Sequence, residues 1–180
     1  MNIKRFQTIS KIISIILKFT AIIMLGVVLL GVFFLNDYKL DIVFNSIIED
    51  PIFHISSYHV EHLEYSNIIK NSLQITAVLE IAVLSYVYWR SAQLFKDLSI
   101  GEKPFTTRFA QSVKSISLII IASDLLFPLL LSLIITLQLE RGYYLMFDFT
   151  SMFLFGLMLY VFSGIFYYGI ELQTLADDTI

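Results

Sequence analysis

The stretch LFKDLSIGEKPFTTR, residues 94–108, separates two long apolar runs in a chain whose residues are 57% hydrophobic. Its charged residues, glycine and proline are typical of a solvent-exposed turn. Gly101 is suited to end a helix, Pro104 prevents its continuation, and Thr106 or Thr107 can cap the next helix. The stretch therefore predicts a tight connection between two helices.

The apolar runs themselves indicate a membrane protein. The mean hydropathy is +0.79, and 15% of the residues are charged, against about 25% in soluble domains. Four runs approach or exceed the ~20 residues that a helix needs to cross a bilayer. The short alternating segments of an outer-membrane barrel are absent from the sequence. We expect one all-α membrane domain over residues 1–180, with spans at about 19–35, 69–89, 113–139 and 147–168.

The distribution of cations predicts the orientation. Nine of the 12 Lys and Arg residues precede the first run or lie near the second connection. The positive-inside rule therefore places both termini, the turn 96–112 and the tail 171–180 in the cytoplasm, and the segment 36–67 outside. The net charge of −3 argues against direct nucleic-acid binding.

The outer segment contains all three histidines, and the chain has no cysteine for thiolate chemistry or disulfides. His59 and His62 are three apart, so on a helix they would share one face and reach one Zn²⁺ ion. The order of a metalloprotease H-E-x-x-H motif is missing. The pattern favours a solvated patch over a metal site, and we expect no metal or other cofactor.

Two acids, Glu80 and Asp124, lie near the middle of the second and third spans. A charged acid at that depth costs at least ~2.5 kcal/mol. We expect them to donate hydrogen bonds to a neighbouring helix backbone or to a serine, and to hold helices together rather than relay protons or cations. Pro128, one turn after Asp124, predicts a kink in the third span. The candidate serine partners are Ser85, Ser117 and Ser123.

The sequence predicts no enzyme. No serine lies in a G-x-S-x-G elbow, and no glycine-rich loop suited to a phosphate follows a strand pattern.

Two stretches of the chain, the turn after residue 94 and the C-terminal tail, resemble the small bacterial membrane proteins known as domain of unknown function 2975. The resemblance covers the chain from about residue 94 onward and implies four spans in the bacterial cytoplasmic membrane. It also implies a cytoplasmic partner, a small helix-turn-helix transcription factor. The residues that carry it are Gly101, Pro104, Phe105, Gly169, Glu171, Leu172, Gln173, Asp178, Thr179 and Ile180.

These observations favour a membrane-tethered regulator or sensor that binds a cytoplasmic partner. The alternatives are a self-protection protein against a membrane-active peptide and a small transporter subunit that uses Glu80 and Asp124. Besides the lipid bilayer and the transcription factor, a homo-oligomer is a further candidate arrangement. The predicted partner-binding residues are Lys96, Gly101, Lys103, Pro104, Phe105, Arg108, Glu171, Leu172, Gln173 and Asp178.

Overall fold

The computed structural model describes residues 3–33, 51–60, 65–101 and 106–177. Its four long helices are each long and apolar enough to cross a membrane, which confirms the predicted number of spans. They are α1 (Ile3–Phe33), α3 (Tyr65–Ile100), α4 (Thr107–Gln138) and α5 (Ser151–Asp177). Two strands, β1 (Phe53–Val60) and β2 (Gly142–Phe149), pair antiparallel in a two-stranded sheet.

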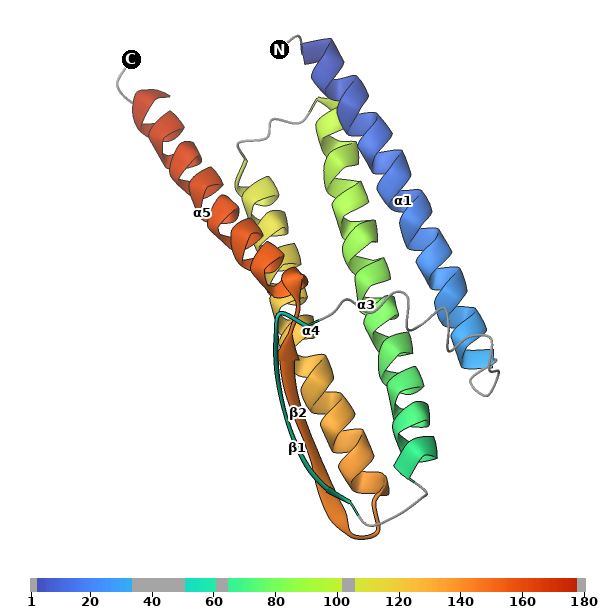
Figure 1. Cartoon of the computed structure of the whole chain (residues 1–180). Coiled ribbons are helices and arrows are strands. Elements are labelled where there is room, and N and C mark those ends of the chain that lie inside the picture. Colours follow the sequence, from blue (N-terminus) through green and yellow to red (C-terminus); the bar gives the residue numbers. More distant parts are fainter. Residues whose placement is uncertain (1–2, 34–50, 61–64, 102–105, 178–180) are drawn as a thin grey trace.

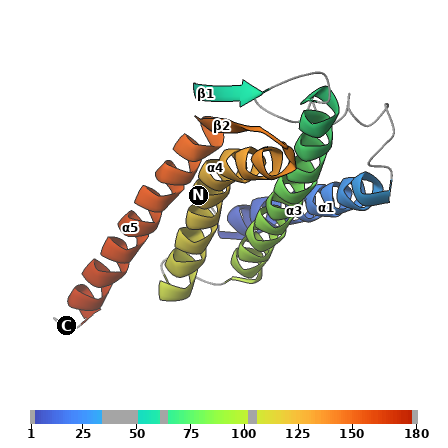
Figure 2. The same cartoon turned by 90° about the horizontal axis from the view of Figure 1, so that it is seen from below.

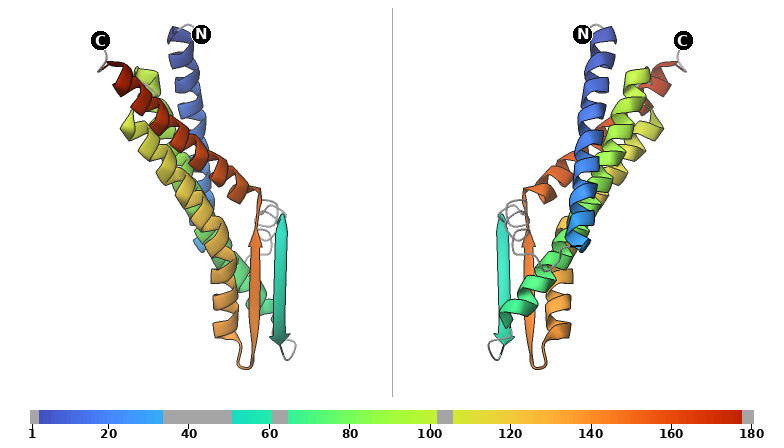
Figure 3. Two further views of the ribbon diagram at one scale, coloured as in Figure 1. Left: turned by 90° about the vertical axis from the view of Figure 1, so that its left-hand side faces the viewer. Right: turned by 90° about the vertical axis from the view of Figure 1, so that its right-hand side faces the viewer.

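The helices lie in a row in chain order (Figures 1 and 2). The main contacts join α1 to α3, α3 to α4 and α4 to α5, and β2 packs along α4. We call the end at which α1 begins and α5 ends the terminal end. The opposite end, where the two strands run beside α4, is the sheet end (Figure 3).

Small polar residues hold α1 against α3. The Ser14 hydroxyl donates to the carbonyl of Ala92 at 2.8 Å, and the Ser85 hydroxyl donates back to the carbonyl of Ala21 at 2.8 Å. Because lipid is as apolar as leucine, such bonds and close packing, rather than burial from water, drive helix association in a membrane.

The connection after α3 forms as predicted in its described part. Gly101 has a φ of 104°, a left-handed conformation that suits glycine at a helix C-terminus. Thr106 is the N-cap of α4, and its side-chain oxygen accepts a hydrogen bond from the Phe109 amide at 3.2 Å. Lys103, Pro104 and Phe105 lie outside the described residues.

The two strands were not predicted, so the expectation of an all-α chain was incomplete. β1 lies in the expected outer segment, of which residues 36–50 and 61–64 are outside the described ranges. The fourth helix begins at Ser151 and not at 147, because Phe147 to Phe149 pair with β1. The hydrophobic run that predicted the span continues through both elements, so hydropathy alone did not separate them.

Candidate functional site

Strand β2 is bonded along one edge to α4 through side-chain hydroxyls. The Ser132 hydroxyl accepts from the Met146 amide at 2.7 Å and lies 3.1 Å from the Met146 carbonyl and 2.8 Å from that of Pro128. The Thr136 hydroxyl accepts from the Tyr144 amide at 3.1 Å and donates to the Tyr144 carbonyl at 2.9 Å. These helix side chains replace a third strand on this edge of β2.

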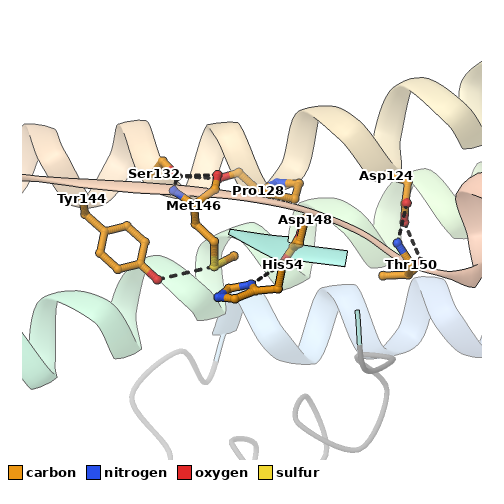
Figure 4. A network of polar contacts seen from close by, with 8 residues as sticks. All are labelled: His54, Asp124, Pro128, Ser132, Tyr144, Met146, Asp148 and Thr150. Carbon is orange, nitrogen blue, oxygen red and sulfur yellow. Dashed lines mark hydrogen bonds and ion pairs between the residues drawn. The ribbon is translucent and has the colours of Figure 1, made fainter. Parts of the chain in front are cut away.

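Asp124 continues this row of contacts toward the start of α5 (Figure 4). Its two carboxylate oxygens accept from the Thr150 amide at 2.8 Å and from the Thr150 hydroxyl at 2.7 Å. The same hydroxyl accepts from the Met152 amide at 3.1 Å, in the first turn of α5. Asp124 therefore fixes the N-terminus of α5 to the middle of α4.

The expected serine partners of the acids were wrong. In the structure Ser85, Ser117 and Ser123 each donate to a backbone carbonyl instead. The hydroxyls of Ser117 and Ser123 bond within their own helix, a common arrangement for serine in a helix. Asp124 accepts hydrogen bonds from Thr150, a residue that sequence reasoning did not single out.

A second polar pair joins the two strands. His54 and Asp148 are directly opposite in the sheet, with 3.6 Å between Nδ1 and Oδ2. Burial raises the pKa of Asp148, whereas the hydrogen bond and charge of His54 lower it in part. The protonation of Asp148 on β2 therefore depends on its contact with β1.

Three carboxylates meet at a small cavity of about 110 Å³ between these elements. Glu80 comes from α3, Asp124 from α4 and Asp148 from β2. Within the described ranges, the Glu80 carboxylate makes no hydrogen bond. Among the described residues, no three or more acids and histidines are arranged to hold a metal ion.

His59, one of the two candidate zinc ligands, is not on a helix. His59 lies on β1, where it is exposed and pairs with Tyr143. The shared helical face was therefore a wrong assumption, and His62 lies outside the described residues.

At the terminal end, the predicted partner-binding residues are divided between two places. Lys96 is exposed on α3, and Arg108, in the first turn of α4, lines a cavity between α3 and α4. Glu171, Leu172 and Gln173 are exposed on the last turns of α5, on the far side of α4 from α3. Asp178 lies outside the described residues.

Sequence reasoning missed the residues that bond α4 to β2, although one signal was present. Asp124, Ser132 and Thr136 are separated by multiples of four residues, which places them on one face of a helix. A polar row on an otherwise apolar helix indicates a polar neighbour.

Comparison with known proteins gives no relative. No family model, curated protein or solved structure matches the chain. The site geometry therefore provides the basis for a functional assignment.

Proposed function

We propose that this multi-pass protein is a membrane-tethered regulator that binds a soluble cytoplasmic partner through the last turns of α5. The main observation is that Leu172 and Leu175 are 49% and 59% exposed on a helix that has become polar around them. Glu171, Gln173 and Thr174 are their neighbours on the same turns.

The two leucines extend an exposed apolar row along α5. The row has spacings of four and three residues, the pattern of a helix face that packs against another helix or into a groove. Bilayer lipid is the natural neighbour of the earlier members. Leu172 and Leu175 lie among polar residues, so a groove on a soluble partner is a better neighbour for them than lipid. The row consists of Val161, Ile165, Tyr168, Leu172 and Leu175.

The distribution of cations supports a cytoplasmic position for this end. Among the described residues, the sheet end carries Lys70 and Arg141, while the other Lys and Arg residues gather toward the terminal end. Positive charge is characteristic of cytoplasmic segments. The resemblance described above favours a small helix-turn-helix transcription factor as the partner and the bacterial cytoplasmic membrane as the location.

The test is affinity purification of the tagged protein from its native membranes in mild detergent. We expect the natural protein to capture a soluble DNA-binding protein, and the double variant Leu172→Gln, Leu175→Gln to lose it. The variant Gln173→Ala, Thr174→Ala changes the same turns outside the apolar row and should retain it. Capture that is equal in all three proteins would exclude this surface as the docking site.

A transporter subunit that uses the three carboxylates is the second candidate. The cavity shared by Glu80, Asp124 and Asp148 is the observation in its favour. The two bonds from Thr150 to Asp124 favour a structural role for that acid. The variant Glu80→Gln distinguishes the regulator from the transporter subunit, because it should leave partner capture unchanged and abolish any acid-coupled transport.

A further inference from the structure

A cavity of about 360 Å³ lies between α3 and α4 near the terminal end. Its polar side chains recur one turn apart on both helices, so each helix turns a polar face toward the other here. Nearer the middle of the two helices, the same interface is apolar and contains Val87, Ile116 and Ile120. The polar lining includes Arg90, Gln93 and Asp97 from α3 and Arg108, Gln111 and Ser115 from α4.

Arg90 is the residue in this cavity whose charge is best placed to bind a ligand. It is half-buried, and it makes no hydrogen bond or ion pair with any other residue of the described ranges. A guanidinium presents five N–H donors in a planar fork, and a partly buried charge is costly unless it is paired. The cavity therefore offers unused donors to an anion.

Two cation–aromatic contacts flank the cavity and indicate its expected depth in the membrane. The Lys18 ammonium of α1 lies 5.2 Å from the ring centroid of Trp89, which precedes Arg90 in α3. The Lys114 ammonium, which precedes Ser115 in α4, lies 5.7 Å from the ring centroid of Tyr160 in α5. Trp, Tyr and Lys gather at the level of the lipid headgroups. Because both contacts flank the cavity, we expect it to lie at that level.

We propose that this cavity binds the headgroup of an anionic phospholipid, with the phosphate on Arg90 and Arg108. Arginine forks match the geometry of phosphate oxygens, and basic pockets between membrane helices on the cytoplasmic side are suited to anionic headgroups. The carboxylate of Asp97 is a hydrogen-bond acceptor, so it favours a headgroup that also carries hydroxyl groups, such as glycerol. This site shares no residue with the docking surface on α5 and does not depend on it.

The test is native mass spectrometry of the full-length protein in a neutral detergent, with phosphatidylglycerol or phosphatidylcholine of the same acyl chains. We expect phosphatidylglycerol to bind about tenfold more tightly than phosphatidylcholine. Arg90→Gln should weaken phosphatidylglycerol binding about tenfold and remove most of its advantage over phosphatidylcholine. Arg141→Gln removes the same charge at the sheet end and should have no effect.

Ser115→Leu provides a variant without a charge change, because the added side chain fills part of the cavity. It should also weaken phosphatidylglycerol binding. Circular dichroism and thermal unfolding in lipid-free detergent check that each variant is folded. Equal binding of both lipids, or undiminished phosphatidylglycerol binding in folded Arg90→Gln and Ser115→Leu, would overturn the proposal. Inorganic phosphate that displaces the lipid at millimolar concentration would instead identify a soluble phosphate compound as the ligand and overturn the lipid assignment.

Discussion

Asp124 is a buried carboxylate on a membrane helix, and its contacts explain its presence there. It is 8% exposed, and both oxygens accept hydrogen bonds from Thr150. Thr150 in turn caps α5 through the Met152 amide. The N-terminus of a helix carries a partial positive charge, which favours a nearby carboxylate. The N-terminus of α5 thus stabilises the carboxylate of Asp124, and Asp124 in turn fixes the position of α5.

Replacement of Asp124 should therefore destabilise the protein. Asp124→Ala leaves the Thr150 amide without an acceptor, and we expect a loss of about 1–3 kcal/mol in the free energy of unfolding. Ser123→Ala, on the next residue, removes only a bond within the helix and should change stability by less than about 0.5 kcal/mol. Unfolding titrations in detergent would compare the two. Equal effects would mean that the contact with Thr150 contributes nothing specific.

Asp148 should make stability depend on pH. Burial raises its pKa above the ordinary 3.8, so folding favours the protonated carboxyl. That contribution is fully present below the unfolded pKa and is lost as the pH rises through the folded pKa. Relative to Asp148→Asn, the natural protein should therefore lose stability as the pH rises above about 4.

His54 opposes this effect, because its contact with Asp148 favours the ionised carboxylate. His54→Ala should therefore enlarge the pH dependence, whereas His59→Ala, on the same strand, should not. Thermal unfolding at a series of pH values measures both. A natural protein and an Asp148→Asn variant with parallel profiles would show that Asp148 is not perturbed.

At the scale of elements, side chains of α4 can bond to successive amides of β2 because the spacing along the two elements is nearly equal. Four residues of α-helix advance about 6 Å, and two residues of strand advance about 6.6 Å. Ser132 and Thr136 therefore meet Met146 and Tyr144 in register. Buried backbone amides and carbonyls need hydrogen-bond partners, and the helix hydroxyls supply them along this edge of β2.

Loss of these hydroxyls should release the strand locally. In Ser132→Ala, Thr136→Val, the amides of Met146 and Tyr144 lose their acceptors. We expect faster hydrogen exchange in residues 142–149 and unchanged exchange in α1 and α3. Ser14→Ala removes a hydroxyl from the α1–α3 contact instead and should show the reverse pattern. Unchanged exchange in β2 would mean that its pairing with β1 suffices.

Two glycines of α5 make a matched test of the α4–α5 contact. A Cβ atom at Gly156 would come within 2.7 Å of Cγ1 of Ile121, whereas one at Gly164 meets nothing within 4 Å. Gly156→Ala should therefore cost about 1–3 kcal/mol through overpacking. Gly164→Ala should stabilise the helix, by up to about 1 kcal/mol, because alanine has the higher helix propensity. Unfolding in detergent distinguishes them, and a neutral Gly156→Ala would show that the helices separate freely.

At the scale of the molecule, the sequence was most informative where the signal is local. Helix number, the Gly101 end of α3 and the Thr106 cap of α4 depend on residues near one another in the chain, and all three were predictable. The β1–β2 sheet depends on partners such as His54 and Asp148, which are far apart in the sequence. Their pairing leaves no periodic pattern in either strand. The bond from Thr150 to Asp124 could not be predicted either, because these two residues are also far apart in the sequence.

The predicted orientation can be tested directly because the chain has no cysteine. Arg141 and Gln173 are exposed at opposite ends of the molecule. In intact cells, a membrane-impermeant maleimide should label Arg141→Cys, and it should label Gln173→Cys only after the membrane is permeabilised. Labelling of Gln173→Cys alone in intact cells would invert the topology and move the proposed docking surface outside.

The row arrangement has a consequence for biosynthesis. Each helix packs mainly on helices that neighbour it in the chain, so it meets its partners as it leaves the ribosome and enters the membrane. β1 is the exception, because its partner β2 is translated only after α3 and α4. Domains form their contacts in the order of synthesis where they can. The sheet is therefore the last part of the described chain to close, because β1 has no partner strand until two more helices have been made.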